Sequence, residues 1–322
     1  MEYRHLGNSG VYVSEIALGS WLTYSLSVDY DAAQQIITTA YENGINFFDT
    51  ADVYNNHGAE RVLGQALSDI PRADLFIGSK VYGRVGEGPN DQGLSRKHIF
   101  EGIEASLEAL DMEYLDLYQC HRYDEHTPLR ETVRAMSDLV ELGVVLYWGV
   151  SLWPADKIRQ ACRIADDMNG HRPVSNQPRY NLLDRSVEVN GVQETCADEG
   201  LGLVVYSPLA EGILTGKYAG GKIPEDSRAA TDEINQFIQQ KMSDESIKKS
   251  EELVDIADEL DTSAAVLALA WLLEQKAMSS VIIGASKPSQ VEENIKAVEL
   301  EIPEGIMHRL NTLFPAGEDQ HS

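Results

Sequence analysis

The chain has 322 residues, enough for one large α/β barrel or two ordinary domains, and at 43% hydrophobic it can bury a full core, which excludes a disordered chain. Its 52 acidic residues against 26 lysines and arginines give a formal net charge of -26, so nucleic acid and anionic membranes are not expected partners. The acid excess also suits a protein from a high-salt cytoplasm, so we include a halophilic origin as a hypothesis. A melting temperature that does not change with salt concentration would contradict it.

Apolar, β-rich runs alternate with helical patterns along the whole chain. Helical spacing of apolar residues is clear over 29–41, in the segment that Ser95 is expected to cap, and in the one that ends at Gly143. Eight strands alternating with helices predict a parallel sheet, and over this length they favour a (β/α)8 TIM barrel, a single domain spanning 1–322. The eight predicted strands are 15–19, 45–49, 75–80, 114–121, 144–151, 173–177, 201–207 and 279–286.

The segments outside this repeat have expected places on the barrel. Tyr3 to Leu6 and Val11 to Ser14 predict an N-terminal β-hairpin around the turn Gly7 to Gly10, which could cover the barrel floor. The long segments 83–93 and 210–245 follow the third and seventh strands. In a TIM barrel such loops lie on the C-terminal face, where active sites are built.

The cysteines and the apolar runs indicate the compartment. Cys120, Cys162 and Cys196 lie far apart without a CxxC or Cys/His cluster, so neither a disulfide framework nor a metal site is expected. The N-terminus has no apolar signal core, and the longest apolar run, 264–273, is shorter than the roughly 20 residues that span a bilayer. We therefore expect a soluble, cytoplasmic protein.

Four chemically active side chains are expected at the C-terminal ends of successive strands. Asp49 ends the second strand, Tyr54 lies in the loop that follows, and Lys80 and His121 end the third and fourth. A phenol with a pKa of about 10 is a poor acid at neutral pH, but a neighbouring ammonium lowers that pKa. Each residue alone has a simpler structural explanation. Together they predict a site in which a tyrosine protonates a carbonyl oxygen as hydride reaches the carbon.

The C-terminal segment "IIGASKPSQVEEN" is the candidate phosphate site, since no GxGxxG follows a predicted strand. Pro288 suits the first position of a helix, which would place the amides near Ser286 and Ser289 at its N-terminus. Lys287 adds local positive charge. From the pattern alone, an ordinary closing turn remains the alternative.

Seven segments, in order and over nearly the whole chain, resemble the aldo-keto reductases. They are "FFDTADVYNNHGAERVLGQAL", "IGSKV", "LDLYQCHRYDEHTPLRETVRAM", "YWGVS", "SNQPRYNLL", "YSPLAEGILTGKY" and "IIGASKPSQVEENI". The nearest branch is the one of the potassium-channel beta subunits and their prokaryotic relatives. The resemblance implies a TIM barrel, a nicotinamide cofactor and the catalytic tetrad Asp49, Tyr54, Lys80 and His121. The similar channel subunits carry asparagine at the position of His121, so the histidine favours catalysis.

The resemblance also implies a cofactor site at the barrel mouth. Many family members bind the 2′-phosphate with an arginine where this chain has Gln290; Lys287 and Arg228 could compensate. NADP(H) is therefore expected, and NAD(H) stays open. The expected cofactor-binding residues are Gly19, Trp21, Asp49, Ser151, Asn176, Gln177, Tyr206, Ser207, Pro208, Leu209, Lys217, Arg228, Gly284, Ser286, Lys287, Gln290, Glu293 and Asn294.

The main prediction is an NADP(H)-dependent reductase of small aldehydes or ketones, with Trp21, Tyr82 and Trp153 as candidate walls of the substrate pocket. One alternative is a cofactor-binding redox sensor or regulatory subunit with slow turnover. Another is a Schiff-base lyase with Lys80 as nucleophile, which the C-terminal phosphate segment disfavours. The branch often forms tetramers or larger assemblies, which leaves a homo-oligomer open.

Overall fold

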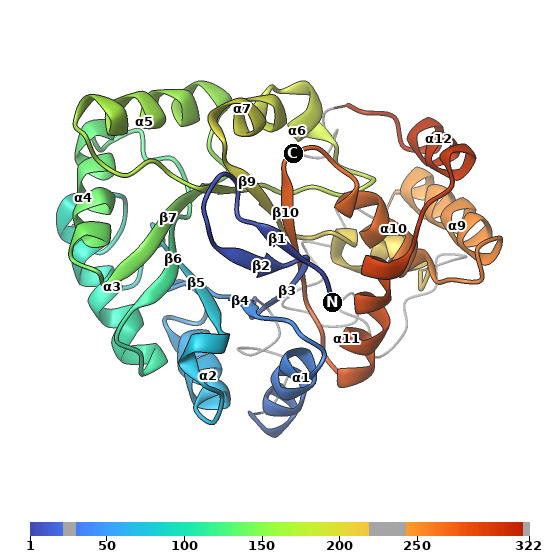
Figure 1. The fold of residues 1–322 in the computed structure, drawn as a ribbon, viewed down its shortest axis with the longest axis horizontal. Helices are drawn as coiled ribbons and strands as arrows, with labels where there is room; N and C mark the ends of the chain where they lie inside the picture. The colour runs from blue at the N-terminus through green and yellow to red at the C-terminus, as the bar shows by residue number, and fades with distance from the viewer. Residues whose placement is uncertain (22–29, 219–242, 318–322) are drawn as a thin grey trace.

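Eight parallel strands close into a barrel in the computed structural model, which describes residues 1–21, 30–218 and 243–317 (Figure 1). The predicted TIM barrel is confirmed, because β10 pairs in parallel with both β9 and β3 and so closes the sheet. The barrel strands are β3 (Ile16–Gly19), β4 (Phe47–Asp49), β5 (Phe76–Val81), β6 (Leu115–Cys120), β7 (Val145–Ser151), β8 (Ser175–Gln177), β9 (Gly202–Val205) and β10 (Met278–Ile283).

Helices surround the barrel, and the predicted helix signals lie where the sequence places them. Ser95 caps α3 by accepting a hydrogen bond from the His98 N–H, and Gly143 follows α4 with a φ of 75°. The helices are α1 (Tyr30–Glu42), α2 (Gly58–Leu67), α3 (Arg96–Leu110), α4 (Leu129–Glu141), α5 (Ala155–Asp167), α6 (Ser186–Val189), α7 (Val192–Glu199), α9 (Asp244–Asp258), α10 (Ala264–Leu273), α11 (Pro288–Asn294) and α12 (Glu304–Leu313), with 3-10 turns at Arg72–Asp74, Ala210–Thr215 and Ile295–Glu299.

The N-terminal hairpin closes one end of the barrel, as predicted. β1 (Tyr3–His5) pairs antiparallel with β2 (Tyr12–Ser14), and Figure 1 shows the two strands lying across the barrel axis. Leu6 and Val13 are fully buried there. They pack against interior residues of the barrel strands, namely Ala17, Phe47, Phe76, Leu117, Val204 and Ile282. The hairpin therefore fills the N-terminal end and leaves the C-terminal end for a site.

Three strands end earlier than the sequence pattern suggests, the run 114–121 by one residue, at Cys120, and two others by more. The run 201–207 is a strand only to Val205, and the run 279–286 only to Ile283. After β9 the chain leaves the sheet, since Tyr206 forms an isolated bridge with Arg179 and Ser207 has a left-handed φ of 51°. Apolar content alone could not show these ends, because Tyr206 and Ala285 continue the apolar runs beyond the last strand residues.

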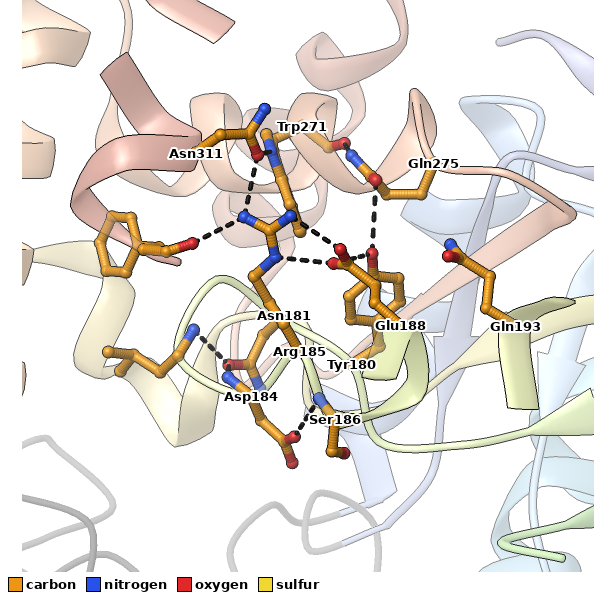
Figure 2. Close-up of polar contacts among 12 residues, drawn as sticks. Tyr180, Asn181, Asp184, Arg185, Ser186, Glu188, Gln193, Trp271, Gln275 and Asn311 are labelled. Atoms are coloured by element: carbon orange, nitrogen blue, oxygen red, sulfur yellow. Dashed lines mark hydrogen bonds and ion pairs between the residues drawn. The ribbon is translucent and has the colours of Figure 1, made fainter. Parts of the chain in front are cut away.

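A buried arginine ties the segment after β8 to the C-terminal helices (Figure 2). Arg185 donates to both carboxylate oxygens of Glu188 at 2.6 and 2.8 Å and to Asn311 Oδ1 at 2.9 Å. It also donates to the Phe314 carbonyl at 2.6 Å, and its guanidinium lies 4.9 Å from the centre of the Trp271 ring. This network joins α6 to α10 and α12.

We expect Arg185→Ala to lower the free energy of unfolding by about 3 kcal/mol, because the change leaves Glu188 and the Phe314 carbonyl without their partner. Urea unfolding measures this. The control is Arg172→Ala, which removes surface pairs with Asp166 and Glu199 and should cost little. Equal effects of the two changes would contradict a structural role for the buried network.

Candidate active site

The four residues of the predicted tetrad meet at the C-terminal end of the barrel. Lys80, on β5, donates from Nζ to Asp49 Oδ2 at 2.5 Å and to the Thr50 carbonyl at 2.7 Å. The same ammonium lies 3.5 Å from the Tyr54 hydroxyl. His121 follows β6, and its ring lies 5.8 Å from the Tyr54 ring at 78°, edge to face. Asp49 and Lys80 come from neighbouring strands, so the barrel itself determines their separation.

Burial sets the protonation state of Tyr54, and the Asp49 carboxylate sets that of Lys80. Burial raises the pKa of Tyr54 above its usual value, while the Lys80 ammonium opposes this rise. The net direction differs from the lowering expected from sequence, because the cost of burying a phenolate outweighs the nearby charge. Burial would lower the pKa of Lys80, but the Asp49 carboxylate raises it above its usual value. At neutral pH Tyr54 therefore carries a proton and Lys80 a positive charge.

His121 is a neutral hydrogen-bonding group in this site. Burial holds the pKa of its imidazole well below the usual range, and the nearby charges of Lys80 and Arg122 lower it further. A neutral imidazole can orient a carbonyl oxygen through an N–H without competing to protonate it. The charged state of Lys80 counts against the Schiff-base alternative, because an ammonium is not a nucleophile.

Of the three residues expected around the nicotinamide amide, two lie beside the tetrad. Gln177 donates from Nε2 to Asp49 Oδ1 at 2.8 Å, and Ser151 donates to the Gln177 carbonyl at 2.8 Å. Asn176 faces the opposite way, toward Cys196 on α7, because successive side chains of a strand alternate across the sheet. The structure does not bring the Asn176 side chain to the barrel mouth.

The residues expected near β3 and the substrate have different surroundings. A Cβ at Gly19 would lie 2.7 Å from the Ile282 side chain, so packing against β10 favours glycine there. The Trp21 ring lies 6.5 Å from that of Tyr54 and is 37% exposed, which places it at the mouth. Tyr82 is half-buried. Trp153 is buried and packs edge to face on Tyr123 at 5.2 Å.

The loop after β9 is compact and holds a lysine close to its backbone. Ser207, Ala210 and Glu211 all have left-handed φ values, of 51°, 47° and 55°. A Cβ at Gly212 would lie 2.7 Å from Lys217 Nζ, so the lysine folds back over this loop. Tyr206 and Leu209 are half-buried, and Pro208 is buried. Loop and ammonium together fit an anion such as a pyrophosphate.

A turn beneath this loop supports it. Asn181 Nδ2 donates to the Ser207 carbonyl at 2.9 Å. Asn181 Oδ1 accepts from the amides of Leu183 and Asp184, and Figure 2 shows Asn181 beside Asp184. Arg185 follows directly, so the buried network described above holds the turn. The loop that carries Ser207 is thereby anchored to α10 and α12.

The C-terminal segment follows β10 as expected, with one difference. Pro288 is the first residue of α11, and Lys287 precedes it as an exposed side chain. Gln290 Oε1 accepts from the Ser286 amide at 2.7 Å and from its hydroxyl at 3.2 Å. The Ser286 amide, expected at the helix N-terminus for a phosphate, is therefore bonded to Gln290, because this side chain reaches back over the first turn.

The remaining predicted residues of this segment lie around the same helix. Gly284 is exposed directly after β10. Glu293 pairs with Lys296 at 2.5 Å, and Asn294 is buried at the end of α11. Arg228 lies outside the described residues.

Comparison with known proteins agrees with this arrangement. Residues 15–313 match the model of the aldo/keto reductase family. The chain belongs to the aldo/keto reductase family. This match confirms the predicted resemblance. Members of this family are generally NAD(P)H oxidoreductases.

Three relatives show which members of the family are similar. A protein of Oryza sativa subsp. japonica is 42% identical over 302 residues, which is 93% of this chain and 92% of the relative. One of Arabidopsis thaliana is 43% identical with the same coverage. Both are named probable voltage-gated potassium channel subunit beta. A putative subunit of the same kind from Schizosaccharomyces pombe is 40% identical, over 92% of this chain and 88% of the relative.

Sequence reasoning missed several groups of this candidate site. The Thr50 carbonyl accepts from Lys80, and Ser20 Oγ donates to Thr50 Oγ1 at 2.8 Å. Glu211 accepts from Ser207 Oγ at 3.1 Å and from Arg179 at 3.4 Å. The carboxylate in the loop "SPLAEG" was visible in sequence, but its ion pair depends on a residue 32 positions away.

Within the described ranges, no helix is long and apolar enough to cross a membrane. Nor do the described residues contain a group of three or more His, Cys, Asp and Glu side chains that could hold a metal ion.

Proposed function

We propose that this chain is an NADP(H)-dependent reductase that converts small aldehydes or ketones to alcohols, and catalyses the reverse reaction. The observation that carries the proposal is the contact of the Tyr54 hydroxyl with the Lys80 ammonium, beside His121, at the open end of the barrel. A protonated phenol next to a fixed positive charge is a proton donor whose anion is stabilised as it forms.

Each residue has one part in the reaction. A bound nicotinamide supplies hydride to the carbonyl carbon. The Tyr54 hydroxyl gives its proton to the carbonyl oxygen, and Lys80 stabilises the phenolate that remains. Asp49 keeps Lys80 charged and in place. His121 holds the carbonyl oxygen through an N–H, which fixes the carbon at the distance that the transfer requires. Oxidation of the alcohol reverses these steps.

The residues present fit the cofactor. Gln177 lies against Asp49, Ser151 donates to the Gln177 carbonyl, and both would bind the nicotinamide amide. Tyr206 would stack on the ring, and Lys217 with the Ser207–Gly212 loop would hold the pyrophosphate. The backbone there requires left-handed conformations, and the ammonium supplies the positive charge that an acidic protein needs to bind an anion. For the 2′-phosphate we propose Lys287 and the Gln290 amide, with NADP(H) preferred over NAD(H).

The experiment that tests this function follows the loss of the reduced-nicotinamide absorbance with NADPH and with NADH. A panel of small aldehydes and ketones is used, at low and high salt. We expect turnover with NADPH and a higher KM for NADH. Absence of binding by either cofactor would overturn the proposal. Binding of NADPH without turnover of any carbonyl would support the alternative described next.

The second candidate function is that of a regulatory subunit or redox sensor that binds the cofactor and turns over slowly. The relatives named probable voltage-gated potassium channel subunit beta cover 93% of this chain, which favours a regulatory role. The two functions differ in rate, since a sensor would retain NADPH longer than one turnover takes. Single-turnover oxidation of bound NADPH, compared with its release, separates them.

We also propose a cytoplasmic location, because Cys120, Cys162 and Cys196 are all free and buried, as suits a reducing compartment. Fractionation of cells with a tagged full chain would test this, and recovery in the secreted fraction would contradict it.

A further inference from the structure

The turn and helix that follow Tyr54 carry a group of polar side chains that the proposed proton transfer does not use. His57 follows Tyr54 by three positions, and Glu60 is in the first turn of α2. His57 Nδ1 lies 2.6 Å from Glu60 Oε2, and Ser79 Oγ donates to Glu60 Oε1 at 2.5 Å. The Glu60 side chain has no exposed surface and that of His57 only 12%. A charged pair is strong and directional in such surroundings.

This contact joins the two segments that carry the proposed donor and its ammonium. Ser79 directly precedes Lys80 on β5, and the alternation of the strand sends Ser79 outward to α2 while Lys80 points into the barrel. On the other side, the Ala59 amide donates to the Tyr54 carbonyl at 3.1 Å. Glu60 thus connects the backbone on both sides of the Tyr54–Lys80 contact.

The turn between Tyr54 and α2 has a backbone that needs support. Asn55, Asn56 and His57 have φ values of 52°, 46° and 63°, all in the left-handed region. Residues other than glycine adopt this region rarely, and three in a row persist only where surrounding contacts fix them. The His57 amide donates to the Asp52 carbonyl at 2.7 Å, and its ring is held by Glu60.

The charge of this turn depends on pH. The hydrogen bond with Glu60 raises the pKa of His57, against the effects of burial and of Arg61, and Asp52 raises it too. His98, on α3, also faces His57. Asp52 is itself fully buried; burial and Glu60 raise its pKa to about 7. The buried Tyr118 hydroxyl on β6 lies near Asp52 and Glu60.

The titrations of His57 and Asp52 both make the surroundings of Glu60 more negative as the pH rises. His57 is positive and Asp52 neutral at low pH, so Glu60 has a cation beside it. As the pH rises through about 7 and through the pKa of His57, Asp52 becomes negative and His57 neutral. Glu60 then faces a second carboxylate without its cation, and the support of the turn is lost.

We propose that His57 and Glu60 are positioning residues, whose contact, anchored on Ser79, holds the turn after Tyr54 so that the phenol stays beside Lys80. The inference rests on the proposed function, because it is the proton donor that is positioned. It adds to that function the expectation that kcat falls as the pH rises and the charged groups of this turn titrate. Burial raises the pKa of Tyr54 above its usual value, so the phenol stays protonated while the turn titrates.

The test uses His57→Asn, Glu60→Gln and the double variant of the full chain. Asparagine accepts the left-handed backbone without the ring, and glutamine keeps the shape of the carboxylate without its charge. We expect each single change to lower kcat roughly 10-fold, as small displacements of a reacting group do, with the Kd of NADPH unchanged. The alkaline fall of kcat should become smaller in His57→Asn, because only the titration of Asp52 beside Glu60 remains. The double variant should lose no more than the worse single one, because both changes break the same contact.

A matched control is His171→Asn, which breaks an exposed histidine–carboxylate contact of 2.9 Å with Glu141 far from Tyr54 in sequence and should change nothing. Unchanged kcat and an unchanged pH profile in His57→Asn would overturn the proposal. So would a loss of kcat that merely follows a lower melting temperature or weaker NADPH binding, since either indicates a general structural role.

A readout independent of turnover separates this inference from the proposed function. Tyrosine labelled with carbon-13 at Cζ, with the Tyr54 signal assigned by Tyr54→Phe, reports the surroundings of that phenol by NMR. The spectra are taken below about pH 7, where the turn of the wild type keeps its support. We expect the Tyr54 signal to shift in His57→Asn and Glu60→Gln, because the phenol moves away from the Lys80 ammonium. An unchanged Tyr54 signal overturns the positioning role even if the wild type proves to have no turnover. A shifted signal supports it in either case.

Discussion

Replacement of Tyr54 by phenylalanine is expected to lower kcat for carbonyl reduction by roughly 10³-fold, within the range that general acid catalysis contributes. The Tyr54 hydroxyl lies 3.5 Å from Lys80 Nζ and beside His121, and burial keeps it protonated at neutral pH. Phenylalanine keeps the ring and removes the proton. The Kd of NADPH, measured by fluorescence, should change little, because the predicted cofactor contacts come from other residues.

Tyr41→Phe is the matched control. It removes a tyrosine hydroxyl that donates to Asp74 at 2.9 Å at an exposed site, so kcat should not change. If Tyr54→Phe retained wild-type kcat at saturating substrate and cofactor, the proton must come from another group, and the proposed role of Tyr54 would be wrong.

Lys80→Met should have two large effects. First, kcat should fall by roughly 10³-fold or more, because the phenolate formed at Tyr54 loses its stabilising charge. Second, unfolding should become easier by roughly 3–5 kcal/mol, the usual cost of leaving one member of a buried ion pair alone. Lys80 is fully buried, and Asp49, 2.5 Å away, is 3% exposed. Steady-state kinetics and urea unfolding measure the two effects separately.

A double variant separates catalysis from stability. In Lys80→Met with Asp49→Asn no buried charge is left unpaired, so much of the stability should return while kcat stays low. Recovery of kcat together with stability would show that Lys80 acts only by holding the fold. Full retention of stability in Lys80→Met alone would mean that Asp49 takes up a proton or is solvated at no cost.

The sequence by itself determined the architecture and the tetrad. Alternating apolar runs and helical patterns identify eight strands, and closure follows because each strand needs a partner on both edges. Asp49, Lys80 and His121 each stand at the end of a predicted strand. In a parallel barrel all such ends share one face, so their meeting with Tyr54 could be predicted without coordinates.

Tertiary structure decided what depends on direction and burial. Asn176 and Gln177 are adjacent in sequence, but only Gln177 points to Asp49, because the register of β8 selects one face of the strand. The pKa of Tyr54 rises instead of falling, since burial is a property of the surroundings. The left-handed turn brings His57 to Glu60, and Glu60 accepts from Ser79 only because α2 packs beside β5. Periodicity fixes which elements form, whereas these contacts arise only once the elements pack.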